Sequence, residues 1–360
     1  MPRVQQLLEE LSNSFGPSGF EGPVREIVKR EMLPLVDTVE TDGIGSLIGR
    51  LGKSDGYPRI MLAGHMDEVG LIVRYVTPEG YVKFQTLGGW LDQALINQRW
   101  TILTKNGLVH GITGIKTPHV MAPEARNQVF KREQMFLDIG AESKEDAEER
   151  LGICPGDPIA PDSAFQVLSG GKLYLGKAWD DRVGVALMLE VLRGLQNQPL
   201  ESTIYAVATV QEEIGLRGAH TSANRVAPDI GVNFESGVAG DYPGITQDEA
   251  QEKVGEGPSV FLHDSSMLPN LKLRDFVLDV AKDLGIHVQF NVLSGYGQDG
   301  AEMQKAHSGA PAINIAIPTR YLHSHNSIIS RSDFDQAVVL SIEILRRLDN
   351  LTVKNIRSFD

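Results

Sequence analysis

Two adjacent carboxylates, Glu212 and Glu213, follow an apolar, β-branched run at residues 204–210. The run has the composition of a buried parallel strand, and open α/β sheets place their ligand crevice at the carboxyl ends of such strands. Because neighbouring carboxylates repel each other, the pair requires a cation or a shared proton nearby. The alternative is a pair of glutamates in an exposed surface turn. Our hypothesis is that a cation lies beside Glu212 and Glu213. The other polar clusters of the chain provide further evidence on this hypothesis.

Four further polar clusters lie near the ends of strand-like runs or at strand-to-helix junctions. They are His65 with Asp67, Asp180 with Asp181, Glu235, and His323 with His325. Imidazole and carboxylate ligands without thiolate suit Zn²⁺ or Co²⁺, and also Mn²⁺. Two metal ions about 3.5–4 Å apart need one bridging carboxylate and further protein ligands on each side. The clusters together supply the two histidines and three carboxylates of such a dinuclear site.

Each cluster alone also has a structural explanation. In the His-x-Asp motif, the aspartate could simply orient a buried imidazole. Asp180 or Asp181 could cap the helix that begins there. His323 and His325 face the same side of an extended segment, so either could be a ligand. The hypothesis therefore depends on all the clusters converging on one crevice.

The elements that would position these clusters alternate between strands and helices. Helices are expected at 4–11, 24–32, 180–195, 271–284 and 334–348, and strands at 59–63, 203–210, 230–234, 287–293 and 311–317. This alternation predicts an α/β fold with a mostly parallel sheet flanked by helices on both faces. Ser332, with Asp335 three residues later, is the expected cap of the last helix.

Residues 71–170 have a different character. Short strands are expected at 71–76, 81–84, 100–104 and 108–112, separated by turn signals, and a charged helix capped by Ser143 is expected at 144–150. We therefore predict a β-rich, barrel-like domain over 71–170, inserted into a catalytic domain formed by 1–70 and 171–360.

Composition excludes several classes of function. The chain has 360 residues and a net charge of −13, which argues against nucleic acid and anionic membranes as partners. The only cysteine, Cys154, excludes an intrachain disulfide and a cysteine-rich zinc site, and we expect it to be a packing residue. The sequence shows neither a transmembrane run nor a signal-peptide pattern. These features predict a cytoplasmic protein.

Taken in order, the motifs resemble those of the glutamyl aminopeptidase/TET family of dinuclear metallo-aminopeptidases, in the clan of zinc exopeptidases. That family includes cellulase-M-like and FrvX-like relatives. The matching stretches are 18–25, 64–70, 177–182, 210–219, 239–241 and 320–325. The resemblance implies a zinc-exopeptidase-like three-layer core and a dimerisation domain inserted after the His-x-Asp strand.

The resemblance also implies roles for individual residues. Asp180 would bridge the two metal ions, with His65 and Glu235 completing one site and Glu213 and His323 completing the other. Position 235 is often Asp in relatives, and the longer Glu could change metal preference or occupancy.

Three further assignments concern catalysis and the substrate. Glu212 would be the catalytic carboxylate and Asp67 the partner of His65. The segment 295–301 departs from the family's more usual Gly-Gly-Thr-Asp-Ala, so Gln298 and Asp299 are expected to shape the substrate pocket. Arg320 is a candidate substrate-binding residue and, with Lys177, a candidate cation for acidic substrates.

The reaction that the resemblance implies is removal of the N-terminal residue from short peptides with a free N-terminus. A water molecule activated by two divalent ions would be the nucleophile, with Glu212 as general base and acid. Zn²⁺ is the favoured ion, with Co²⁺ or Mn²⁺ as alternatives. Dimers assembling into a dodecamer are expected. The competing functions are a related metal-dependent deacylase or carboxypeptidase, an endoglucanase-type glycoside hydrolase and a non-catalytic binding scaffold. The preferred N-terminal residue is left open.

Overall fold

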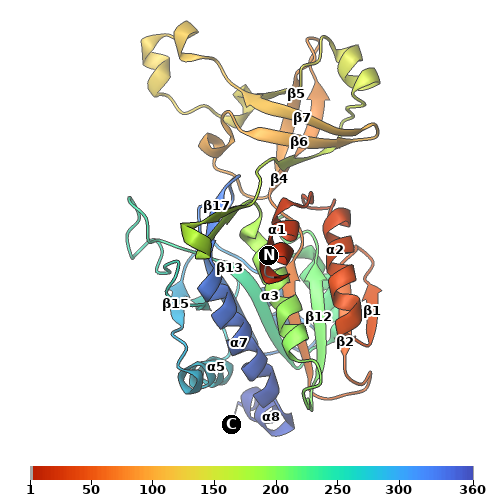
Figure 1. The fold of residues 1–360 in the computed structure, drawn as a ribbon, viewed down its shortest axis with the longest axis vertical. Helices are drawn as coiled ribbons and strands as arrows, with labels where there is room; N and C mark the ends of the chain where they lie inside the picture. Colours follow the sequence, from red (N-terminus) through yellow and green to blue (C-terminus); the bar gives the residue numbers. More distant parts are fainter. Residues whose placement is uncertain (1–2, 360) are drawn as a thin grey trace.

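The computed structural model describes residues 3–359. They form a mixed α/β core and a smaller β-rich part, drawn above the core in Figure 1. Within the described residues, no helix is both long and apolar enough to cross a membrane.

The core is built on one large sheet with the strand order β1-β2-β12-β3-β13-β16-β17-β11-β10, and β14 and β15 continue from β16. The bounds are β1 Thr38–Thr41, β2 Leu47–Leu51, β3 Arg59–His65, β10 Gln166–Leu168, β11 Leu173–Gly176, β12 Thr203–Thr209, β13 Ile230–Val238, β14 Ser259–His263, β15 Gln289–Val292, β16 Ala312–Arg320 and β17 Ser327–Ser330.

The sheet is mixed, so the expectation of a mostly parallel sheet is wrong for the sheet as a whole. The central strands β12, β3, β13 and β16 pair in parallel, as expected for apolar strands linked by helical crossovers. The outer pairs β1–β2, β16–β17 and β10–β11 are antiparallel. Short connections join each of these pairs, and a short connection can only reverse the chain direction.

Helices cover both faces of this sheet. One layer contains α1 Arg3–Asn13, α2 Gly22–Met32, α3 Trp179–Gly194, α5 Leu271–Leu284, α7 Arg331–Arg347 and α8 Asn350–Arg357, and the other contains α4 Arg217–Val226 and α6 Gly300–Lys305. Strand β3 shows why two layers are needed. Ile60 and Leu62 pack in the first layer, whereas Met61 and Ala63 pack in the second, because successive side chains point to opposite faces.

The cap of α7 differs from the prediction. Ser330, rather than Ser332, is the N-cap, and its hydroxyl accepts a hydrogen bond from the Asp333 amide. The two serines are two residues apart, and strand β17 runs up to Ser330, which places the helix start earlier than the apolar pattern suggested.

The smaller part is a closed barrel with the strand order β4-β5-β8-β7-β6-β9. Its strands are β4 Gly70–Val76, β5 Val82–Leu87, β6 Arg99–Thr104, β7 Gly107–Gly114, β8 Phe136–Asp138 and β9 Pro158–Pro161. Short 3-10 helices occur at Asp92–Leu95, Pro118–Val120, Pro123–Asn127 and Arg132–Gln134 here, and at Leu33–Leu35 and Ser169–Gly171 in the core. We call Gly70–Pro161 the barrel module.

Two details of the β-rich region differ from simple expectation. The charged helix is only a short π-helical segment, Asp146–Arg150, with the Asp146 amide bonded to the Ser143 hydroxyl. Strand β10 lies within 71–170 but pairs with β11 in the large sheet. The domain limits 1–70, 71–170 and 171–360 stay a prediction.

Cys154 is exposed, so the expectation that it packs in the interior is wrong.

One buried carboxyl in the core lies outside the predicted polar clusters. Glu252 is fully buried, and its Oε1 accepts hydrogen bonds from Ser259 Oγ at 2.5 Å and Asn291 Nδ2 at 2.8 Å. Its Oε2 has no hydrogen-bond partner within the described part of the chain and lies against Gly237 of β13, where a Cβ would come within 1.9 Å. Burial raises the pKa of Glu252 to about 7.

This carboxyl generates a prediction about stability and pH. The pKa of Glu252 is higher in the folded than in the unfolded chain. The free energy of unfolding therefore falls by about 3 kcal/mol as the pH rises from about 4.5 to about 7. In Glu252→Gln this loss disappears. We expect calorimetry at about pH 5 and about pH 8 to show a smaller decrease in Tm for the variant than for the natural chain.

The exposed Glu26 provides the control, since Glu26→Gln should keep the natural pH dependence. If Glu252→Gln lost as much stability as the natural chain over the same range, the pKa of Glu252 would not be raised in the folded chain.

Candidate metal centre

The predicted polar clusters converge at the carboxyl ends of the central parallel strands. His65 ends β3, and the segment carrying Glu212 and Glu213 follows β12. Thr209 at the end of β12 lies opposite His65 in the parallel register. Glu235 lies within β13, and His323 follows β16. The fold therefore gathers residues from distant positions in the sequence into one crevice, as parallel sheets do.

Asp180 lies between the two imidazoles. Its Oδ1 is 3.0 Å from His65 Nε2, and its Oδ2 is 3.1 Å from His323 Nε2. Around His65 Nε2, Glu235 Oε1 lies at 3.7 Å and Glu212 Oε2 at 3.8 Å. Glu213 Oε1 lies 3.5 Å from His323 Nε2. Each oxygen of Asp180 thus faces a separate group of side chains, which is the arrangement that a bridging carboxylate requires.

The site contains more buried negative charge than its two histidines can balance. Burial, together with neighbouring carboxylates, raises the pKa of Glu212 and Glu235 well above the usual range and that of Glu213 to about 7. Burial would also raise the pKa of Asp180, but its contacts with His323 and His65 outweigh this and lower it. Such shifts show a cluster that is short of positive charge.

A divalent cation fits this deficit. Glu213 Oε1 is buried without a hydrogen-bond partner in residues 3–359. His65 forms close groups with Asp180 and Glu213 and with Asp181 and Glu235, in which the possible ligand atoms lie within 4.8 Å of one another. The donors are oxygen and nitrogen only, which suits Zn²⁺, Co²⁺ or Mn²⁺.

Asp67 does more than contact His65. Its Oδ1 accepts a hydrogen bond from the Glu212 amide at 3.0 Å and lies 3.4 Å from His65 Nδ1. Its Oδ2 accepts from the Ser18 hydroxyl at 2.6 Å and from the Glu213 amide at 3.2 Å. Asp67 is fully buried, yet these donors lower its pKa. It therefore fixes the backbone of the glutamate pair as well as the imidazole.

Asp181 behaves as the capping alternative anticipated. Its Oδ1 accepts from the Gly184 amide at 2.9 Å, as an N-cap does, and its Oδ2 accepts from the His65 amide at 3.1 Å. Asp180 instead points into the crevice. The two neighbouring aspartates are thus held differently, Asp181 by backbone amides and Asp180 with its carboxylate in the crevice.

The two histidines of the 323–325 segment also separate. His323 lines the crevice, whereas His325 is buried against the barrel module, where its Nε2 donates to the Arg99 carbonyl at 2.8 Å. Of the two alternatives left open by the sequence, only His323 lies in the site.

Two residues predicted to meet an acidic substrate, Arg320 and Lys177, are each paired with a carboxylate of the protein. Arg320 forms a two-pronged ion pair with Asp241, with Nε 2.8 Å from Oδ1. Lys177 is buried in an ion pair with Glu68 at 2.6 Å. Neither cation is free to meet an acidic side chain.

Two other candidates lie beneath the crevice. Gln298 is fully buried, and neither of its side-chain polar atoms has a hydrogen-bond partner within residues 3–359. Asp299 accepts from the Thr209 hydroxyl at 2.5 Å, and burial raises its pKa to about 6. Neither residue lines the cavity.

The crevice encloses a cavity of about 200 Å³. Besides the predicted residues, its lining includes Gly89, Leu216 and Gly295–Gly297. The sequence analysis did not identify Gly89, Leu216 or Tyr296. Tyr296 stacks on Phe261 and donates its hydroxyl to the Ser236 carbonyl at 3.0 Å. In the sequence, the glycines on either side of Tyr296 were the signal that this residue could lie at the tip of a loop.

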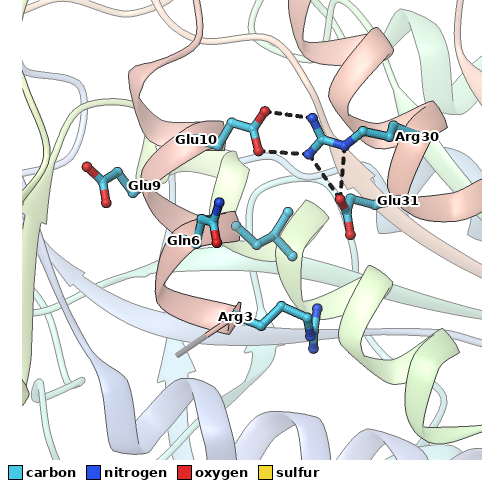
Figure 2. Close-up of a pocket in the computed structure, with 7 residues that line it drawn as sticks. Arg3, Gln6, Glu9, Glu10, Arg30 and Glu31 are labelled. Atoms are coloured by element: carbon cyan, nitrogen blue, oxygen red, sulfur yellow. Dashed lines mark hydrogen bonds and ion pairs between the residues drawn. The ribbon is translucent and has the colours of Figure 1, made fainter. Parts of the chain in front are cut away.

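A larger cavity of about 670 Å³ lies between α1 and α2. Figure 2 shows Arg30 there, paired with Glu10 and Glu31. This cavity contains no imidazole, and Arg30 is already neutralised, so it offers no comparable metal chemistry.

Comparison with known proteins agrees with this geometry. A family model described as M42 glutamyl aminopeptidase matches residues 45–340. The glutamyl aminopeptidase of Lactococcus lactis is 34% identical over 347 residues, covering 95% of this chain and 96% of the relative.

Solved structures are also similar. The TET aminopeptidase from a marine sediment Thaumarchaeota archaeon has 44% identity and a TM-score of 0.95, covering 98% of this chain and 99% of that one. The TET1 peptidase of Pyrococcus horikoshii, which can assemble into a tetrahedron or a large octahedral shell, has 31% identity and a TM-score of 0.87, covering 96% and 100%.

The Asp67 network generates a prediction about metal affinity. Ser18→Ala removes one of the donors to Asp67 and loosens the backbone that carries Glu213. Loss of such a supporting hydrogen bond typically costs about 10- to 100-fold in metal affinity. We expect competition titration with a chromophoric chelator to show weaker Zn²⁺ binding.

Ser341→Ala, at a buried serine on α7, is the matched control and should leave affinity unchanged. Equal affinities for the natural chain and Ser18→Ala would mean that Asp67 holds its geometry without this donor.

Proposed function

The chain belongs to the M42 glutamyl aminopeptidase family, and on that premise we propose that the crevice is a dinuclear metal centre that removes the first residue of short peptides. Aminopeptidase activity follows from the family. The observation that carries the finer proposal is the position of Asp180, with one oxygen toward His65 and the other toward His323.

The proposed ligands divide into two sets that share Asp180. His65 and Glu235 complete one set, and Glu213 and His323 complete the other. Two divalent ions, when bound, would supply the Lewis acidity that activates water and polarises the scissile carbonyl. We propose Zn²⁺ as the natural ion, with Co²⁺ or Mn²⁺ as possible replacements.

Glu212 is the proposed general base and acid. It lines the cavity, its amide is fixed by Asp67, and burial raises its pKa. A carboxyl with a raised pKa can accept a proton from water and pass it to the leaving amine at neutral pH. The adjacent Glu213 would be occupied as a ligand, so the two carboxylates perform different tasks.

The cavity also bears on the substrate. Its volume of about 200 Å³ and its carboxylate lining suit the first residue of a peptide, with its free amino group among acidic side chains. A longer N-terminal extension would meet the walls of the crevice. We therefore propose short peptides with a free N-terminus as substrates.

We further propose that the barrel module mediates dimerisation and that dimers assemble into a dodecamer. Several barrel side chains are apolar and exposed, including Leu108, Val120 and Val129, which is typical of association surfaces. The similar TET1 peptidase can assemble into a tetrahedron or a large octahedral shell. With the single cysteine free, we propose that the assembly acts in the cytoplasm.

The first prediction for this mechanism concerns Glu212. Glu212→Gln keeps the size of the side chain but cannot accept the proton, so kcat should fall by about 10²- to 10⁴-fold. Metal content, measured by mass spectrometry, should stay at the natural level because Glu212 is not a proposed ligand. Glu145→Gln, at an exposed position, is the control. Near-natural turnover with full metal content would rule out Glu212 as the proton carrier.

The second prediction concerns metal removal. Dialysis against EDTA should abolish hydrolysis of aminoacyl-p-nitroanilides, and Zn²⁺, Co²⁺ or Mn²⁺ should restore it. Metal removal should also lower Tm, because ions that bind only the folded chain stabilise it. Without the ions, the buried carboxylates of the crevice repel one another. N-acylated substrates should not be cleaved. Hydrolysis of the anilide that survives verified metal removal would rule out the metal-dependent mechanism.

A further inference from the structure

A two-glycine link of the barrel module contacts one half of the metal centre. Gly88 and Gly89 lie between β5 and β6. A Cβ on Gly88 would come within 2.9 Å of Glu213 Oε2, and the Gly89 carbonyl accepts a hydrogen bond from His323 Nδ1 at 2.7 Å. The hydrogen bond leaves His323 Nε2 facing Asp180. The link thus contacts Glu213 and His323, the two ligands proposed for one ion in addition to the shared Asp180.

The other half depends on the core alone. His65 is the last residue of β3 and Glu235 lies within β13. Their supports are also core residues: the Asp181 carboxylate accepts from the His65 amide, and Glu235 accepts from the Ser236 amide. The two proposed ions would therefore be held by different parts of the molecule.

The segment that carries His323 needs external support. Tyr321 and His323 have φ angles of 62° and 54°, in the left-handed region that non-glycine residues rarely adopt. Such a conformation is unfavourable and persists only where surrounding contacts hold it. His323 is also partly exposed, with 32% of its side chain accessible. The support must come from neighbouring residues.

His325 provides that support. It is buried, and its Nε2 donates to the Arg99 carbonyl at 2.8 Å at the start of β6. Its ring packs edge-on against Trp100, with centroids 4.4 Å apart, and lies 5.8 Å from Trp90. Trp90 directly follows Gly89 and donates its Nε1 to the Gly70 carbonyl at 3.1 Å. One side chain therefore joins the ligand segment to the barrel residues next to the two-glycine link.

We propose that His325 is a positioning residue for the ion held by Glu213 and His323, and that the barrel module is thereby part of the machinery that binds this ion. His325 keeps the 323–325 segment against the barrel, so that the Gly89 carbonyl stays at His323 Nδ1 and Nε2 stays aimed at Asp180. The ion held by His65 and Glu235 has no ligand in the 323–325 segment and shares only Asp180 with the other ion. The inference rests on the proposed dinuclear centre.

The test compares three variants by titration with Zn²⁺ and Co²⁺ after metal removal. His325→Ala removes both the hydrogen bond and the aromatic packing, and it should weaken one of the two ions by about 10- to 100-fold and leave the other unchanged. His325→Gln keeps an N–H donor for the Arg99 carbonyl and should recover part of the affinity. His307→Ala is the matched control, because His307, like His325, donates its Nε2 to a backbone carbonyl, here that of Asn224.

Two readouts separate positioning from general damage. Thermal unfolding of His325→Ala with metal bound at both sites should stay cooperative, although Tm falls because buried packing is lost, and excess metal should restore kcat. The visible spectrum of the Co²⁺-loaded protein should change for one ion only, because only one ligand set has moved.

The possible results are distinguishable. If the natural chain binds two ions and His325→Ala binds both with natural affinity, the positioning role is wrong and the dinuclear centre stands. Equal weakening of both ions, or the same weakening in His307→Ala, also overturns the positioning role. If the natural chain binds no metal, the proposed function itself fails.

Discussion

Burial of the Asp67 carboxylate is the constraint on which the site depends. A carboxylate removed from water must be satisfied by protein donors, and Asp67 obtains them from the Ser18 hydroxyl and from the amides of Glu212 and Glu213, with the imidazole of His65 alongside. These donors come from the turn after α1, the segment after β12 and the end of β3. A single buried charge therefore fixes three distant segments relative to one another.

The charges around the site are divided into two layers. Beneath the crevice, Glu68 pairs with Lys177 and lies 3.4 Å from Arg182, all three buried. Asp67, Glu21 and Asp181 also act on Arg182, so these buried cations are already accompanied by carboxylates. In the crevice itself, the carboxylates of Asp180, Glu212, Glu213 and Glu235 are accompanied only by imidazoles. The separation explains why the lysine and arginine near the motifs do not neutralise the crevice and why the carboxylates there are suited to cations.

The sequence predicted that these polar residues converge, because each has a local signal. A polar residue that ends an apolar strand stands out, and parallel strands bring such residues together. His323 and His325 could not be separated, because the difference between them is a contact with Arg99, more than two hundred residues earlier in the chain. Gly89 gave no signal for the same reason. The pairing of Arg320 with Asp241 likewise depends on tertiary structure, although both charges were visible in the sequence. Short outer strands made the sheet mixed, and their direction follows from connections that periodicity does not report.

The closed strand order of the barrel module has a consequence for assembly. A barrel whose first and last strands pair has fewer unpaired backbone amides and carbonyls along an edge than an open sheet of the same strands. Closure therefore disfavours joining neighbouring subunits by extension of this sheet and favours contacts through the side chains on its outer surface and loops. Contacts of that kind are set by shape and by residue type at each position, so closely related chains could share the same barrel and yet select different partners and different assemblies.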